Sequence, residues 1–173
     1  GRGEALTYAA LVAATEALAT AFQSLDPKPG SRVGICAYNT REHLLALLAA
    51  YAAGKVWVPL NPRNGRAELD AMIAVTQPSL VVADESCVDR FTPPGAPMVL
   101  AKTDRGRAGL RTIDQLLAEF NGQQPDVVPR SSEDEQIIKF SGGSTGRPKA
   151  VVQSARCVNA QAGGLSEGFG FDQ

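Results

Sequence analysis

A regular alternation of short apolar runs and helical patterns constrains the fold of this chain more than any other feature. The run "RVGICAY" (32–38) is typical of a buried strand; leucines at helical spacing follow it, and then comes a second run, "KVWVPL" (55–60). A strand, a helix and a strand in so short a span imply two parallel strands joined by a right-handed crossover. The sequence therefore predicts an α/β fold with a mostly parallel sheet flanked by helices.

Capping residues and further apolar runs extend this pattern along the chain. Thr7 and Thr40 precede two of the predicted helices as N-caps, and Thr112 with Gln115 has the spacing of a capping box before another. A further helical pattern covers 69–76, and the other predicted strands are 79–84, 97–101, 136–140 and 150–153.

The chain divides into four parts on this reading. Residues 1–120 carry the α/β layers, and 121–135 form a polar connector with two prolines that we expect to run over the surface. Residues 136–153 form a strand–loop–strand hairpin, and 154–173 begin a further helix, capped at Ser154, that we expect to break at its glycines. Because no further strand follows the hairpin, and a helix opens almost at Gly1, we expect a fragment of a larger protein whose true N-terminus lies upstream.

Composition excludes several classes of function. Lys and Arg number 17 against 18 Asp and Glu, so the chain lacks the basic charge of a nucleic-acid binder. No apolar run is long enough to span a membrane, and the first residues do not show the pattern that we expect of a secretory signal. The three cysteines are scattered, which fits neither a disulfide framework nor paired metal ligands and favours a cytoplasmic location. The single histidine, His43, leaves no basis for a metal site or a Ser-His-Asp or Cys-His hydrolase.

The stretch "FSGGSTGRPKA" (140–150) has two readings. A Gly- and Ser-rich stretch between apolar runs is most often a plain hairpin turn. Three kinds of residue favour phosphate binding instead: glycines that let backbone N–H groups approach an anion, hydroxyl donors, and cations. These are, in the same order, Gly142, Gly143 and Gly146; Ser141, Ser144 and Thr145; and Lys149 with Arg147.

The residues after the glycines exclude the common helix-linked phosphate loops. Those loops need a lysine followed by Ser or Thr and then a helix, whereas here Pro148 precedes Lys149 and "AVVQ" (150–153) is typical of a strand. No strand–GxGxxG–helix arrangement of a dinucleotide site occurs here either. We therefore expect a flap, meaning a flexible loop that joins two antiparallel strands and covers the phosphates. We do not expect a rigid phosphate-binding loop at the N-terminus of a helix.

The segment "SGGSTGRPKAV" (141–151) resembles the phosphate-binding loop of the adenylate-forming superfamily. This superfamily comprises acyl- and aryl-CoA synthetases, peptide-synthetase adenylation domains and luciferases. The positions that match the family pattern are Ser141, Gly143, Ser144, Thr145, Gly146, Pro148 and Lys149. Gly142 stands where a serine is usual and Ala150 where a glycine is usual. The segments "ALTYAALVAATEALATAF", "GSRVGICAYNTREHLLALLAAYAAGKVWVPLNP" and "AELDAMIAVTQPSLVVAD" resemble the opening of these enzymes, most of all fatty-acid–CoA ligases.

The resemblance implies that the chain is part of a large N-terminal domain and that the whole enzyme joins a carboxylic acid, a fatty acid in the nearest relatives, to coenzyme A. The acid attacks Mg-ATP to give an acyl-adenylate and pyrophosphate, and the thiol of coenzyme A then displaces AMP. The implied phosphate-binding residues are Ser141, Gly142, Gly143, Ser144, Thr145, Gly146 and Lys149. The family's adenine motif, magnesium-associated acid, ribose aspartate and catalytic lysine lie further along, so we expect no catalytic residue here and no turnover by this chain alone.

Two other functions stay open. An adenylation domain would pass the acyl group to the thiol of a carrier protein, and a carrier domain further along the gene would favour it. A non-catalytic nucleotide-binding module would keep the flap as a structural element, and intact catalytic motifs further along would count against it.

Overall fold

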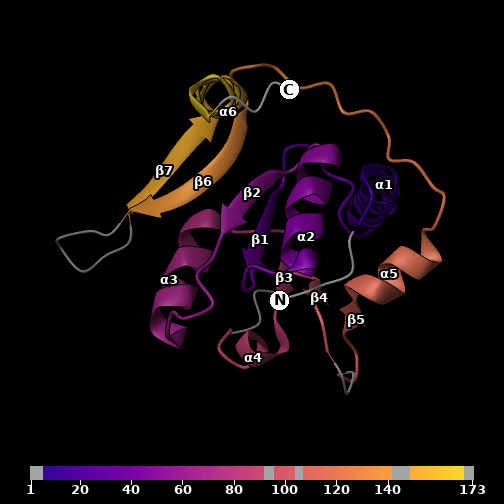
Figure 1. The fold of residues 1–173 in the computed structure, drawn as a ribbon. Helices are drawn as coiled ribbons and strands as arrows, with labels where there is room; N and C mark the ends of the chain where they lie inside the picture. The colour runs from indigo at the N-terminus through magenta and orange to yellow at the C-terminus, as the bar shows by residue number, and fades with distance from the viewer. Residues whose placement is uncertain (1–5, 92–95, 104–106, 142–148, 170–173) are drawn as a thin grey trace.

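The fold of this chain is a twisted sheet between two layers of helices, shown by a computed structural model that describes residues 6–91, 96–103, 107–141 and 149–169 (Figure 1). Within these ranges seven strands lie in the order β5-β4-β3-β1-β2-β6-β7, and every neighbouring pair is parallel except β6 and β7. The strands are β1 Arg32–Cys36, β2 Val56–Pro59, β3 Leu80–Ala83, β4 Met98–Leu100, β5 Arg111–Thr112, β6 Glu135–Ser141 and β7 Lys149–Ser154. The predicted mostly parallel α/β fold is confirmed.

Four of the helices begin directly after the N-cap residues that the sequence predicts, Thr7, Thr40, Thr112 and Ser154. The helices are α1 Tyr8–Leu25, α2 Arg41–Ala52, α3 Arg66–Thr76, α4 Glu85–Val88, α5 Ile113–Glu119 and α6 Ala155–Phe169. The Thr7 hydroxyl accepts a hydrogen bond from Ala10 N at 3.2 Å, and the Thr40 hydroxyl accepts one from His43 N at 3.3 Å. Thr112 and Gln115 form both bonds of a capping box. Such caps satisfy N–H groups that have no partner inside the helix.

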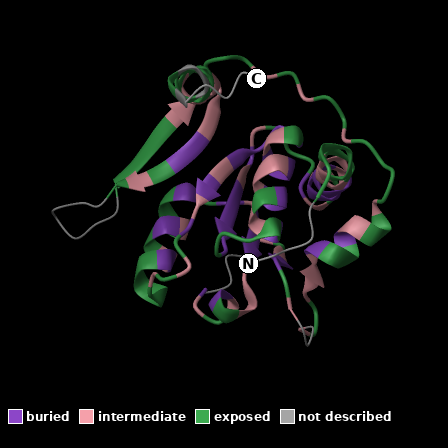
Figure 2. Ribbon diagram, viewed as in Figure 1, coloured by how far each residue is buried: buried purple, intermediate pink, exposed green. Residues whose placement is uncertain are grey.

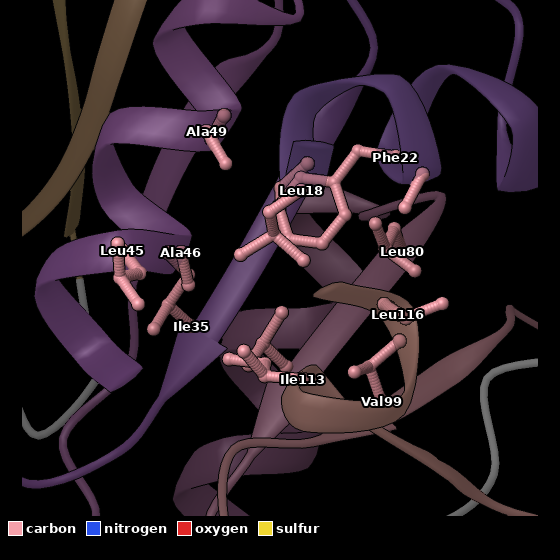
Figure 3. Packing of buried hydrophobic residues seen from close by; sticks show 14 of the residues in the cluster. Leu18, Phe22, Ile35, Leu45, Ala46, Ala49, Leu80, Val99, Ile113 and Leu116 are labelled. Carbon is pink, nitrogen blue, oxygen red and sulfur yellow. The ribbon is translucent and has the colours of Figure 1, made fainter. Parts of the chain in front are cut away.

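Two hydrophobic clusters occupy the two faces of the sheet. On one face α1, α2 and α5 pack against β1, β3 and β4, where Leu18 and Phe22 gather with Leu80 and Leu116 (Figure 3). On the other face α3 and α4 cover alternate residues of the same strands, together with β2 and Ile138 of β6. Each fully buried Leu or Phe contributes about 1.5–3 kcal/mol to folding.

A buried polar cluster lies where the central strands begin. The Lys55 ammonium is only 1% exposed and lies 3.3 Å from Asp26 Oδ2; it also donates to Ser31 Oγ at 2.9 Å and to the carbonyl oxygens of Asp26 and Lys28. Ser31 and Ser79 donate to the same Asp26 carboxylate. Burial raises the pKa of Asp26, but these hydrogen bonds and the Lys55 charge outweigh it and hold the pKa below the ordinary value of an aspartate. Burial lowers the pKa of Lys55, and the Asp26 carboxylate opposes that shift.

The segment between α5 and β6 has no regular structure and crosses the outside of the molecule, mostly exposed (Figures 1 and 2). Side chains fasten it at two points. Gln23 of α1 exchanges two hydrogen bonds of 2.9 Å with the backbone of Asp126, and Arg130 Nη1 donates to Gly54 O at 2.9 Å. The segment therefore follows one path along the edge of the sheet where the strands begin.

The last helix is longer than the sequence predicts. Ser154 Oγ accepts a hydrogen bond from Cys157 N at 3.4 Å, as expected of its cap. However, α6 continues through Gly163 and Gly164 to Phe169, so the expected break at the glycines is wrong. Neither glycine has a positive φ. Each glycine costs only about 1 kcal/mol relative to alanine in a helix. The high helix propensity of the neighbouring Ala, Gln and Leu residues offsets this cost.

Two short elements, α4 and β5, were absent from the sequence prediction because neither is long enough to show a period. Across the described ranges, no helix combines the length and the apolar character that a membrane crossing requires.

Candidate functional site

The hairpin of β6 and β7 holds the ends of the predicted phosphate loop. The two strands are antiparallel, as predicted, with Phe140 opposite Ala150 and Ser141 opposite Lys149. β6 joins the sheet by parallel pairing with β2, where Ile137 is opposite Trp57. Lys149 is a strand residue and does not open a helix, which agrees with the predicted flap.

The alternation of side chains along the hairpin separates core from candidate site. Ile138 and Phe140 face the α3 side and pack with its hydrophobic cluster. Ser141 and Lys149 point to the other face, because successive residues of a strand alternate. That face is shared with Trp57, whose ring makes edge-to-face contacts with His43 and Tyr51 of α2. The predicted ligand-binding pair therefore lies on the α2 side of the sheet.

Two of the predicted site residues can be placed. Ser141 and Lys149 are both exposed and directly opposite each other at the ends of their strands. The other five, Gly142, Gly143, Ser144, Thr145 and Gly146, lie outside the described residues. Residues directly opposite in an antiparallel pair have Cβ atoms about 4.5–5.5 Å apart, so one anion can meet both side chains.

The position of this pair in the sheet also suits a ligand. Because β6 is parallel to β2, Ser141 lies at the edge where the parallel strands end. The ends of β1 and β3 meet at the same edge, where the Tyr38 N–H donates to Asp84 Oδ2 at 2.7 Å. Ligands of open α/β sheets bind outside the carboxyl ends of the strands.

Comparison with known proteins agrees with this geometry. A family model described as "AMP-binding enzyme" matches residues 1–172. The chain belongs to the AMP-binding enzyme family. The predicted resemblance to adenylate-forming enzymes is thereby confirmed.

Individual members of the AMP-binding enzyme family show how much of such a protein the chain represents. A feruloyl-CoA synthase from Amycolatopsis is 35% identical over 162 residues, which are 91% of this chain and 31% of that protein. A nonribosomal peptide synthetase, gloA, from Glarea lozoyensis is 31% identical over 169 residues, but these are 2% of its length. The crystal structure of ATP-bound MatB from Rhodopseudomonas palustris superimposes with a TM-score of 0.77 at 25% identity, over 95% of this chain and 33% of MatB. The chain thus spans about a third of the feruloyl-CoA synthase and of MatB.

At the hairpin, the described residues supply charge and hydroxyl groups. Within the described ranges no group of three or more His, Cys, Asp or Glu side chains is placed to hold a metal ion. Cys36 and Cys87 are buried on the α3 side, and burial raises the pKa of the Cys36 thiol, so it stays protonated and unreactive. His43 bonds to Ala37 O through Nδ1 at 2.9 Å, and its ring makes an edge-to-face contact with Trp57.

One exposed cation of the hairpin was not singled out in the sequence. Lys139 lies two residues before Ser141 and therefore on the same face of β6. The alternation in "QIIKFS" was the signal that could have found it, since it places Lys139 with Ser141 and opposite to Ile138 and Phe140.

Proposed function

We propose that residues 1–173 belong to the large N-terminal domain of an acid–thiol ligase that activates a carboxylic acid with ATP and transfers the acyl group to coenzyme A. Within it, residues 1–120 would supply the α/β layers, 121–135 the connector, 136–153 the phosphate-binding hairpin and 154–173 the start of the next helix. The observation that carries the proposal is the exposed Ser141–Lys149 pair at the carboxyl edge of the sheet, in a chain of the AMP-binding enzyme family.

In the first step a carboxylate oxygen of the acid attacks the α-phosphorus of ATP, and the bond from that phosphorus to the pyrophosphate oxygen breaks. The products are an acyl-adenylate and pyrophosphate. We assign to Ser141, Gly142, Gly143, Ser144, Thr145, Gly146 and Lys149 the binding of the β- and γ-phosphates. Lys149 would neutralise charge that grows on the leaving pyrophosphate, and such positioning and charge stabilisation make up most of phosphoryl-transfer catalysis. In the second step the thiol of coenzyme A attacks the acyl carbon, and AMP leaves.

In this proposal Mg²⁺ is bound to the phosphates of ATP and arrives with the nucleotide. Within the described ranges no group of three or more His, Cys, Asp or Glu side chains is placed to hold a metal ion, and Mg²⁺ often keeps phosphates and waters in its shell. No step is assigned to a metal bound by this chain.

We propose a fatty acid as the substrate, on the likeness of the segments quoted above to fatty-acid–CoA ligases. A hydroxycinnamic acid is the second candidate, because the 35% identical relative is named as a feruloyl-CoA synthase. A carrier-protein thiol is the second candidate for the acceptor, because the chain is 31% identical to part of a nonribosomal peptide synthetase. The three free cysteines support a cytoplasmic location for the enzyme.

The test has two parts. The 173-residue chain is titrated with Mg-ATP by calorimetry, and binding that Lys149→Gln weakens at least tenfold supports the phosphate site, since a charge-assisted contact is worth about 1.5–3 kcal/mol. The full-length polypeptide that we propose is then assayed for AMP release with long-chain acids and with ferulate, in the presence of coenzyme A. Equal ATP affinities of the wild-type 173-residue chain and its Lys149→Gln variant would contradict the phosphate site. Exchange of pyrophosphate into ATP by the 173-residue chain alone would contradict the claim that it lacks the catalytic part.

A further inference from the structure

Lys139 and Lys149 occupy diagonal positions on one face of the hairpin. Lys139 is opposite Val151, and the next pair on the same face is Ser141 with Lys149. Diagonal neighbours of this kind lie about 7–8 Å apart at Cα and are within reach of long side chains. Two ammonium groups and a hydroxyl thus project from one small area at the carboxyl edge of the sheet.

The environment of the two lysines does not neutralise them. Both are exposed, and neither forms an ion pair with another described residue. Six described arginines have a carboxylate within 4 Å, and Arg63, Arg66 and Arg90 have none among the described residues; the six are Arg32, Arg41, Arg107, Arg111, Arg130 and Arg156. The residue opposite Lys139 is Val151, 48% exposed, which offers no side-chain acceptor.

The two ammonium groups repel each other across the diagonal unless something compensates their charge. A bound polyanion would do so. A triphosphate suits the pair better than a single carboxylate does, because its oxygens are spread over several ångströms and can meet two ammonium groups at once. Lysine acts on phosphates as a mobile point charge, and this does not require the fixed geometry of an arginine fork.

We propose that Lys139 is a second cation of the nucleotide site and binds the triphosphate together with Lys149 and the Ser141 hydroxyl. This inference rests on the proposed function and extends it, because the family pattern of the loop begins at Ser141 and does not include Lys139. It makes Lys139 a binding residue supplied by the strand, in addition to those of the loop.

The test uses inorganic tripolyphosphate and the 173-residue chain. Calorimetry compares the wild type with Lys139→Gln, Lys149→Gln and the double variant, and Lys28→Gln serves as the control. Lys28 is also exposed but lies at the opposite edge of the sheet. Each hairpin substitution is expected to weaken binding about tenfold, the lower end for charge-assisted contacts at an exposed site. The double variant should lose more than either single one, and Lys28→Gln should stay within about twofold of the wild type, because exposed charges a Debye length apart are screened.

Each outcome has one meaning. A loss in Lys149→Gln with unchanged binding in Lys139→Gln would overturn the role of Lys139 and leave the proposed function standing. No binding of tripolyphosphate by the wild type would overturn the phosphate site and the inference with it. Equal losses in all three single variants would show a general charge effect and would also overturn the inference. Circular dichroism confirms that the variants are folded, which we expect because neither hairpin ammonium group bonds to another described residue.

Discussion

Lys55 lies where the parallel strands begin, and Lys139 and Lys149 lie at the opposite edge of the sheet, where these strands end. The two sites differ in exposure and in bonding partners. Lys55, where the strands begin, is 1% exposed and is surrounded by the Asp26 carboxylate, a serine hydroxyl and two carbonyl oxygens. Lys139 and Lys149, on the hairpin at the other edge, are exposed and form no ion pair with any described residue. The first lysine has all its partners within the protein, whereas the other two have charges free for a ligand.

The difference separates stability from binding. A charge buried with its partners makes folding depend on each of them, because removal of one leaves the others unpaired. An exposed charge without a partner adds little to stability and is available to bind. We therefore expect substitutions at the two edges to give opposite results: loss of stability at one and loss of phosphate affinity at the other.

The largest effect is expected from Lys55→Met. This change leaves Asp26 buried without its cation, which costs about 3–5 kcal/mol for a buried pair. Urea unfolding of the variant and of Lys28→Met, an exposed neighbour, measures the loss. A loss below 1 kcal/mol at Lys55, or a similar loss at Lys28, would remove the contrast between the two edges.

Gly54→Ala is expected to destabilise the same edge by about 2–4 kcal/mol, from left-handed strain and overpacking. Gly54 has a φ of +68°, and a Cβ there would lie 2.6 Å from Cβ of Val128 in the connector. Gly109→Ala is the matched control, because Gly109 has a φ of +79° but open space around it. Thermal unfolding should show the larger loss at Gly54. Equal losses would mean that the connector does not pack there.

Asp26 should make the stability of the protein depend on pH in the acid range. Its pKa is lowered in the folded state, so the stability that it contributes is present above about pH 4, near its unfolded pKa. This contribution is lost as the pH falls through the folded pKa. The difference in unfolding free energy between wild type and Asp26→Asn should therefore be largest at pH 6–7 and shrink toward pH 2. A constant difference over this range would show that the carboxylate charge contributes nothing.

The smallest effect on stability is expected at the hairpin. Lys149→Gln removes an exposed charge with no described ion-pair partner, so the unfolding free energy should change by less than about 0.5 kcal/mol. Urea unfolding of the variant without ligand checks this. A loss as large as that of Lys55→Met would make Lys149 a structural residue and would break the comparison between the edges.

Local signals made much of the fold predictable. Thr7, Thr40 and Thr112 each precede a helix and bond to a nearby N–H, so their role depends only on neighbouring residues. Apolar runs also marked β1 and β2, because a buried parallel strand is apolar on both sides. The Gly163–Gly164 pair misled the prediction, because glycine lowers helix propensity without preventing the helix.

The features that were not predictable depend on residues far apart in the chain. The Asp26 cluster takes Ser31, Lys55 and Ser79 from the starts of three strands, and only the sheet order brings them together. At the hairpin, Ser141 and Lys149 were recognised from the family pattern of the loop. The alternation in "QIIKFS" marks Lys139 as exposed, but its diagonal position to Lys149 depends on the exact register of the antiparallel pair.

The central claim is that the hairpin edge, and not the opposite edge, binds phosphate. Nuclear magnetic resonance of the ¹⁵N-labelled 173-residue chain, titrated with tripolyphosphate, tests it most directly. The account predicts saturable shifts of the backbone amides of Lys139, Ser141 and Lys149, with those of Ser31 and Lys55 unchanged. Shifts that centre on Ser31 and Lys55, or a hairpin that does not respond while the ligand binds elsewhere, would contradict it.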